Sequence, residues 1–398
     1  MNHIYKPLIF FTVVLYCSYA YLYFFNNGLT GFKPLYWQFI TIGAGLSLII
    51  LRLPSGIPNL PRNYFIWLCV FLGNSIFCFL YSGQGEIEVQ ALTKSFEVVA
   101  LLFSFLIIFS GDDAISTIRK ALVMVVLFSV VMNFIDFLTP MWSKVPGRAA
   151  GLYENPTIAG KMLVLAMVAS IPLIPQKIRL IFCAFVGLGV FITFSRGPWL
   201  LWGLAMAGLA STGYFIFSAR IFSVTFVSLL SGFIIYSALT GGILDIMTAI
   251  GLDEYLTTGT YARLGGGTAF TDYSTATRAA VAAKAWSVFA ENPWFGAGLA
   301  VDQGWVTGSH NTYLRMAAEG GIIRLAIFIS LLVILWKMTD NIGRVLIIVY
   351  SVSCLTSHDN LQQPALLVII SLIVTLSNPE NIAIKREPVV LRETAEES

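Results

Sequence analysis

Charged residues are scarce in this 398-residue chain: Asp, Glu, Lys and Arg together make up 11% of it, against about 25% in soluble domains. Hydrophobic residues make up 57%. This balance excludes a large soluble domain, because a soluble surface needs more charge. The apolar residues fall in runs near the roughly 20 residues that cross a bilayer as a helix. The composition therefore predicts an integral membrane protein.

Cysteine and histidine are sparse as well. The five cysteines have no paired spacing and fall inside or at the ends of apolar runs, which argues against both a disulfide framework and a zinc site. The three histidines are His3, His310 and His358. Chemistry that needs an imidazole therefore has few candidates in this chain.

The apolar runs predict an all-α polytopic membrane protein with twelve transmembrane helices. These spans are predicted at residues 8–25, 35–53, 64–81, 96–110, 121–138, 157–174, 178–194, 199–217, 221–241, 321–336, 345–355 and 364–376. The first run has no small-residue cleavage site, which indicates a retained helix rather than a secretory signal. The runs divide the chain into nine helices at 1–243, a long polar loop at 244–310, three helices at 311–377 and a disordered tail at 378–398.

Lys and Arg are distributed unevenly between alternate loops, and the richer side is expected to stay in the cytoplasm. With both termini inside, the inner loops carry Arg52, Arg62, Arg119, Lys120, Lys177, Arg179, Arg220, Lys337 and Arg344. The opposite short loops carry only Lys33, Lys94, Lys144, Arg148 and Arg196. The 244–310 loop then faces outward, away from ATP. Chemistry there requires a donor that is already activated and delivered across the membrane, or else it is a transport step.

A helix is predicted inside the polar loop at 277–291, where alanines surround Trp286. It ends at Asn292, because Pro293 disfavours helical backbone in the residue before it. Arg278 falls in its first turn, where a positive charge opposes the helix dipole. Two interpretations of Arg278 stay open, an anion-binding side chain and a solvated surface arginine.

Two further side chains are candidates for chemistry on the outer side. Arg196 lies in a tight connection before Gly197 and Pro198, on the side poor in positive charge, so it is a candidate anion ligand. The alternative is an arginine that extends to lipid headgroups. His310 has an imidazole, whose reference pKa of about 6.5 suits it to take a proton from a hydroxyl near neutral pH, unless it is purely structural. A histidine with two arginines on one side of a membrane is the pattern of a base beside an anion site.

Several motifs occur in order along the chain. They are Gly151-Leu152-Tyr153-Glu154-Asn155-Pro156, Ser195-Arg196-Gly197, Arg278 followed by Pro293-Trp294-Phe295-Gly296-Ala297-Gly298, and His310-Asn311-x-Tyr313-Leu314 followed by Glu319-Gly320-Gly321. Together they resemble the motifs of the bacterial O-antigen ligase and polymerase superfamily, over roughly residues 151–321. Each motif alone is weak, but their order, spacing and shared outer side make the set specific.

This resemblance implies a GT-C-like glycosyltransferase of the bacterial inner membrane, with both termini cytoplasmic and a periplasmic active site. It also implies a glycan donor on undecaprenyl diphosphate and catalysis without a metal or other cofactor. Arg196 and Arg278 would bind the diphosphate in bidentate fashion and stabilise the leaving group, and His310 would deprotonate the acceptor hydroxyl. Attack from the face opposite the diphosphate would invert the anomeric carbon.

Two weaker candidates lie in outer loops. Arg263, beside a run of three glycines, is either a third anion contact or a solvated loop residue. His358 either supports the site or is an ordinary loop histidine.

Three more candidates lie on or near the predicted spans. Arg315 is about 500° around a helix from His310, so it projects from a different face but could still reach a phosphate. Glu319 could orient Arg278 or His310. Lys161, near the outer start of a span, could also meet the diphosphate.

Four functions remain to be distinguished. The leading hypothesis is a ligase that moves O-antigen onto lipid A-core, and the closest alternative is a polymerase that joins one carrier-linked glycan to another. These two differ only in their acceptor. A flippase or transporter would place its charges at mid-membrane depth in broken helices, where only Lys161 and Arg324 are expected. A channel or scaffold would leave His310 and its two arginines unexplained.

Overall fold

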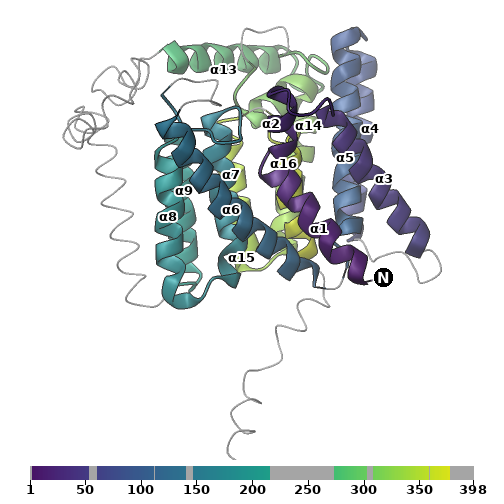
Figure 1. Ribbon diagram of the computed structural model, residues 1–398. Coiled ribbons are helices and arrows are strands. Elements are labelled where there is room, and N and C mark those ends of the chain that lie inside the picture. Colours follow the sequence, from purple (N-terminus) through teal and green to yellow (C-terminus); the bar gives the residue numbers. More distant parts are fainter. Residues whose placement is uncertain are drawn as a thin grey trace, which may run out of the picture.

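Helices make up every regular element in the part of the chain that the computed structural model describes, residues 2–52, 61–111, 113–139, 147–215, 273–302, 308–357 and 359–376. The helices are α1 (Asn2–Cys17), α2 (Ala20–Asn26), α3 (Pro34–Arg52), α4 (Arg62–Tyr81), α5 (Glu86–Ile108), α6 (Ala114–Leu138), α7 (Pro156–Ser170), α8 (Arg179–Phe191), α9 (Arg196–Ser211), α13 (Tyr273–Glu291), α14 (Thr312–Met338), α15 (Asn341–Ser353) and α16 (Pro364–Leu376). Figure 1 shows that most of them stand side by side as one bundle.

Six of the described helices are long and apolar enough to cross a membrane, namely α3, α4, α5, α6, α14, and α7 together with the 3₁₀ turn Ile171–Leu173 that continues it. The α1–α2 pair passes the same test as a seventh, bent span. An all-helical membrane protein is therefore supported, while these helices fall short of the twelve predicted spans. Three of the other helices are short: α8, α15 and α16 have 13 residues each, a length of about 20 Å against a hydrocarbon core of about 30 Å. The predicted span at 221–241 and the predicted tail at 378–398 lie outside the described residues.

The first predicted span, 8–25, is not one continuous helix. It is broken after Cys17, and the helices on either side are bent by 55°. Tyr19 holds the break in a left-handed conformation with φ 59°. Its ring packs on that of Tyr153 at 4.8 Å, and the Tyr153 hydroxyl donates to the Cys17 carbonyl at 2.5 Å. A contact from 134 residues away along the chain therefore replaces the glycine or proline that usually marks such a bend.

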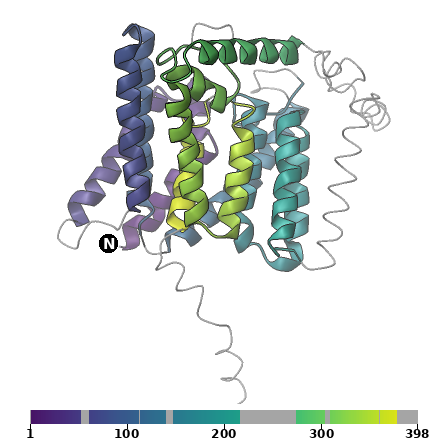
Figure 2. The same cartoon turned by 180° about the vertical axis from the view of Figure 1, so that it is seen from behind.

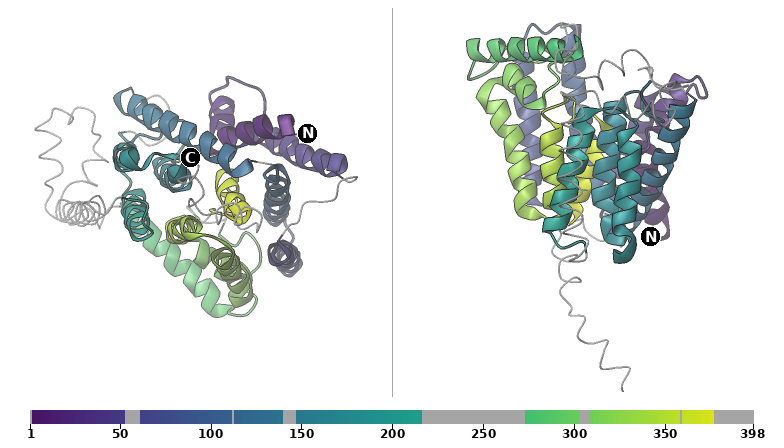
Figure 3. Two further views of the ribbon diagram at one scale, coloured as in Figure 1. Left: turned by 90° about the horizontal axis from the view of Figure 1, so that it is seen from below. Right: turned by 90° about the vertical axis from the view of Figure 1, so that its left-hand side faces the viewer.

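The centre of the bundle is formed by α7 and α16. Twelve of the thirteen residues of α16 are buried, because its sequence is apolar on every face. It packs against α1, α5 and α7, while α7 packs against α6, α8, α9 and α15. Viewed from below, α16 lies in the middle of the other helices (Figure 3).

Helix α13 lies across one end of the bundle and packs against α14 (Figures 1 and 2). The predicted helix at 277–291 is thus present and begins four residues earlier, at Tyr273. Because short connections join successive helices, the starts of α7, α9 and α14 and the ends of α8 and α15 meet at this same end. We call it the α13 end, and we call the other the opposite end.

Candidate active site

The segment before α7 is held by a buried carboxylate. Asp136 Oδ2 accepts hydrogen bonds from the Ala150 N–H at 2.7 Å and the Gly151 N–H at 3.1 Å. Asn155 then caps the helix, since its Oδ1 accepts from the Thr157 N–H at 2.8 Å. Gly151 has φ 55°, a conformation that favours glycine. The glycine and asparagine of this motif therefore serve to turn the chain into α7.

Arg148, in the same segment, is buried against the start of α9. Its Nε donates to the Thr193 carbonyl at 3.0 Å and its Nη2 donates to Ser195 Oγ. Ser195 Oγ also lies 3.3 Å from Thr157 Oγ1. The half-buried Arg196 follows directly as the first residue of α9, at a helix terminus whose backbone N–H groups favour anions. The sequence placed Arg148 on the outer side but did not indicate that it lies beside Arg196.

Lys161 lies on α7 about one helical turn after Thr157, inside the bundle, and is only 1% exposed. Its Nζ donates to Asn360 Oδ1 at 2.6 Å. Asn360 Nδ2 in turn lies 3.0 Å from Ser353 Oγ and 3.2 Å from Cys354 Sγ. The lysine is therefore anchored to the connection between α15 and α16.

His310 stands just before α14 rather than within it. It is half-buried, with a left-handed φ of 51°, which is uncommon for a residue other than glycine. Asn311 caps the helix, because its Oδ1 accepts from the Tyr313 N–H at 2.9 Å and the Leu314 N–H at 3.2 Å. The asparagine of the His-Asn motif thus starts the helix and fixes the backbone that carries the imidazole.

The α15–α16 connection, residues 354–363, links the parts of this site. The Thr312 hydroxyl donates to the Ser357 carbonyl at 2.5 Å, next to the His-Asn motif. On the other side, Gly197 faces Thr356, which is 3.7 Å from the position a Cβ would take. The start of α9, the start of α14 and the buried lysine of α7 therefore meet around one connection. His358, within it, and Arg263 lie outside the described residues.

Arg315 and Glu319 belong to a buried ionic network below His310. Arg315 Nε lies 2.9 Å from Glu319 Oε1 and 3.7 Å from Asp302 Oδ1, and Arg324 Nε lies 3.2 Å from Glu319 Oε2. Two carboxylates therefore balance two guanidinium groups. Helical periodicity does not relate Arg315 to His310, because His310 lies before the start of α14 and is not helical. In this network Glu319 pairs with Arg315 and Arg324 of its own helix, and its role in orienting Arg278 or His310 stays a prediction.

Arg324 extends the network to α4. Its Nη1 donates to Asn74 Oδ1 at 3.1 Å and to Ser75 Oγ at 3.0 Å. Its guanidinium also lies over the Phe71 ring, 5.2 Å from the centroid. The predicted intramembrane Arg324 is therefore tied to neighbouring helices, and neither Asp302 nor Asn74 had been identified from the sequence.

The Pro-x-x-Gly-x-Gly turn docks on the Glu-Gly-Gly motif, where α14 is interrupted by the non-helical Gly320 and Gly321. Three backbone hydrogen bonds join them: Ala297 N–H to the Ala318 carbonyl at 2.8 Å, Gly298 N–H to the Glu319 carbonyl at 3.0 Å and Ile322 N–H to the Pro293 carbonyl at 2.8 Å. A Cβ on Gly321 would lie 2.3 Å from the Trp294 carbonyl. Two motifs that are separate in the sequence therefore form one backbone contact.

Arg278 is exposed on α13, above the bundle end that carries Arg196 and His310. It is the sixth residue of the helix, because α13 begins at Tyr273 and not at the predicted start. The charge at the helix dipole is correspondingly less unfavourable than the sequence suggested. Among the residues with described positions, no group of three or more His, Cys, Asp or Glu side chains could hold a metal ion.

Part of the chain matches a known protein family. Residues 181–329 match a family model described as O-antigen ligase, which covers less than half of the chain. The matched range contains Arg196, Arg278 and His310, and it ends before the α15–α16 connection. No curated protein and no solved structure matches the chain.

Proposed function

We propose that this protein, whose residues 181–329 match a family model described as O-antigen ligase, transfers a glycan from undecaprenyl diphosphate onto a sugar hydroxyl of lipid A-core. The family match indicates an O-antigen ligase or polymerase-type function, which is the broader conclusion. Transfer onto lipid A-core, and the roles of Arg196, Arg278 and His310 in it, go beyond the family match and are what we propose. We expect the reaction at the α13 end, on the periplasmic side of the inner membrane.

The observation that carries this proposal is the convergence of three chain segments on the α15–α16 connection. One brings Arg196, with Arg148 buried beside it; another brings Lys161; the third brings His310 on a capped turn. A diphosphate needs several cationic donors, and guanidinium groups pair phosphate oxygens in bidentate fashion. The arrangement therefore suits an anionic leaving group beside a general base.

In the proposed reaction, the acceptor oxygen attacks the anomeric carbon from the face opposite the diphosphate. The bond between this carbon and the phosphate oxygen breaks, and the electron pair leaves with undecaprenyl diphosphate. His310 takes the proton of the acceptor hydroxyl and later releases it to solvent. Arg196 and Arg278 stabilise the charge that develops on the leaving oxygen, and the anomeric configuration is inverted. This scheme uses no metal or other cofactor.

The test is a reaction in vitro with purified protein, undecaprenyl diphosphate glycan, and either lipid A-core or a second carrier-linked glycan as acceptor. Product with lipid A-core supports the ligase. Product with the second glycan alone contradicts the ligase and supports a polymerase. Movement of the carrier-linked glycan across vesicles without any product supports a transporter.

Two variants test the residue roles. His310→Ala and Arg278→Ala should each lower transfer at least 100-fold while the protein stays folded. Lys284→Ala is the matched control for Arg278, because it removes another exposed cation from the same helix. Wild-type activity in His310→Ala would rule out its role as the base. Equal effects of the Arg278 and Lys284 variants would rule out a specific diphosphate contact at Arg278.

A further inference from the structure

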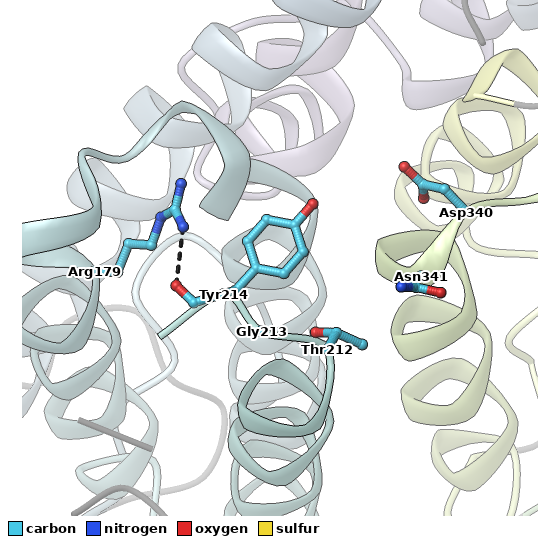
Figure 4. Close-up of a pocket in the computed structure, with 6 residues that line it drawn as sticks. All are labelled: Arg179, Thr212, Gly213, Tyr214, Asp340 and Asn341. Carbon is cyan, nitrogen blue, oxygen red and sulfur yellow. Dashed lines mark hydrogen bonds between the residues drawn. The ribbon is translucent and has the colours of Figure 1, made fainter. Parts of the chain in front are cut away.

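A second polar site lies at the opposite end of the bundle. A cavity of about 500 Å³ is lined there by Arg179, Thr212, Gly213, Tyr214, Asp340 and Asn341 (Figure 4). These residues belong to the start of α8, the end of α9 and the turn between α14 and α15. Since α9 has 16 residues, its two ends are about 24 Å apart, and the cavity is separate from the Arg196 site.

One wall of the cavity is cationic and held in place. Arg179 Nε donates to the Ile174 carbonyl at 2.8 Å, and its Nη1 donates to the Tyr214 carbonyl at 2.9 Å (Figure 4). The guanidinium also lies 5.2 Å from the centroid of the Tyr214 ring. A guanidinium has five N–H donors, and within the described residues these two bonds use two of them. Arg179 is therefore a fixed cation with remaining donor capacity.

A second arginine, Arg119, lies close enough to the cavity for its charge to act on Tyr214. Arg119 is 6% exposed, and its Nε donates to the Ala169 carbonyl at 3.2 Å. Within the described part of the chain, its Nη2 is buried without a hydrogen-bond partner. The negative charge of Asp340, in the cavity lining, acts on this guanidinium. A buried donor of this kind is stabilised by an acceptor that comes within hydrogen-bond distance of it.

The facing wall is acidic. Asp340 Oδ1 accepts from the Gly343 N–H at 2.9 Å and caps α15, with Asn341 beside it. Burial, and then the negative charge of Asp340, raise the pKa of Tyr214 above its ordinary value. The phenol therefore stays protonated and can donate a hydrogen bond. The cavity offers donors for an anionic group on one side and acceptors for a cationic group on the other.

The surroundings are those of a membrane interface. Ile178 and Ile181, on either side of Arg179 in the chain, are 48% and 68% exposed. On the other side, Arg344 lies over the exposed ring of Trp336 at 5.6 Å. Indole rings with neighbouring cations are typical of the headgroup level of a bilayer. Apolar surface beside a polar cavity at this depth fits a lipid better than a soluble metabolite.

We propose that this cavity binds the zwitterionic headgroup of an ethanolamine phospholipid. The phosphate is bound by Arg179, with Arg119 as a second cation close by. The ammonium donates to Asp340, and the acyl chains lie along the isoleucines that flank Arg179. The glycerol of phosphatidylglycerol is neutral and has no positive charge to pair with Asp340, and a choline headgroup has no N–H to donate.

The test is native mass spectrometry of the full-length protein in detergent with four probes: phosphatidylethanolamine, phosphatidylcholine, phosphatidylglycerol and free phosphoethanolamine. We expect the ethanolamine lipid to bind at least fivefold more tightly than the other three. Equal binding of phosphatidylglycerol would overturn the zwitterionic site in favour of a simple anion site. Equal binding of free phosphoethanolamine would show that the acyl chains do not contribute and would overturn a lipid as the ligand. No binding of any probe would overturn the proposal altogether.

Variants of the cavity residues test whether the phospholipid binds in this cavity. Arg179→Ala should weaken phosphatidylethanolamine binding at least fivefold, whereas Lys177→Ala, which removes an exposed cation two residues away, should not. Asp340→Asn should abolish the preference over phosphatidylglycerol, and the helix stays capped because asparagine is an equally good N-cap. Unchanged binding in Arg179→Ala, or an equal loss in Lys177→Ala, would place the lipid elsewhere. Melting temperatures confirm that each variant is folded.

Discussion

The contact between the α13 turn and the break in α14 makes Gly321→Ala an informative substitution. Gly321 has φ 64° and ψ −158°, a region that costs other residues about 1–3 kcal/mol. A methyl group there would also lie 2.3 Å from the Trp294 carbonyl, so the turn must move and the 2.8 Å hydrogen bond from Ile322 to Pro293 is lost. Forced overpacking of this kind costs about 1–3 kcal/mol. The sum predicts a loss of about 2–6 kcal/mol in the free energy of unfolding.

Substitutions of two other glycines separate the conformational cost of a positive φ from the cost of overpacking. Gly28 also has a positive φ, 66°, but a Cβ there meets no atom within 4 Å, so Gly28→Ala carries only the conformational cost. Gly73, on α4, has open space and ordinary helical backbone, so Gly73→Ala should be neutral or stabilise the protein by up to about 1 kcal/mol. The free energies would be measured by unfolding the three variants with a denaturing detergent. A loss in Gly321→Ala no larger than that in Gly28→Ala would refute the tight contact.

Further predictions concern the buried charges of α14. Glu319→Gln leaves Arg315 and Arg324 buried without their shared carboxylate and should reduce the free energy of unfolding by about 3–5 kcal/mol, a loss that adding Arg324→Met should partly reverse. Asp302→Asn keeps the shape but removes one charge, so the same measurement should give a smaller loss of about 1–3 kcal/mol. Arg315→Lys should lower the melting temperature, whereas Arg196→Lys should leave it unchanged and lower kcat/KM for the lipid-linked donor by about 10–100-fold. If Arg196→Lys lowers the melting temperature and Arg315→Lys lowers kcat/KM instead, then Arg196 has the structural role and Arg315 the functional one.

Local patterns predicted several elements correctly. The alanine-rich run and Pro293 gave the helix of the polar loop and its end at Glu291, because both depend on neighbouring residues. The α5 helix starts at Glu86, ten residues before the predicted span at 96–110. Hydropathy detects only the apolar part of a helix, whereas Glu86 and Glu88 favour its first turn through the helix dipole. Boundaries were therefore less predictable than the existence of the helices.

Contacts between distant parts of the chain could not be predicted from one sequence. Lys161 and Asn360 are 199 residues apart, and Arg324 and Asn74 are 250 residues apart. Neither pair has a local spacing that identifies it. The motifs were recognisable one by one, but their common meeting point, the α15–α16 connection, carries no pattern of its own. The position of Arg148 could not be predicted for the same reason, because its burial beside Arg196 depends on the packing of α7 against α9.

The distribution of buried charge divides the α13 end into two sides. On the α14 side, the arginines and carboxylates of the network balance one another, so this side contributes little net field. On the α7–α9 side, Arg148 and Lys161 donate to neutral oxygens, and Gly197, next to Arg196, faces the α15–α16 connection. The negative charge of Asp359, in that connection, acts on Lys161, so three cations lie near one carboxylate there. Under the proposed function, the diphosphate therefore belongs on the α7–α9 side and the acceptor on the side of His310. The α15–α16 connection lies between these two sides, so the glycosyl group would be transferred from the diphosphate to the acceptor beside it.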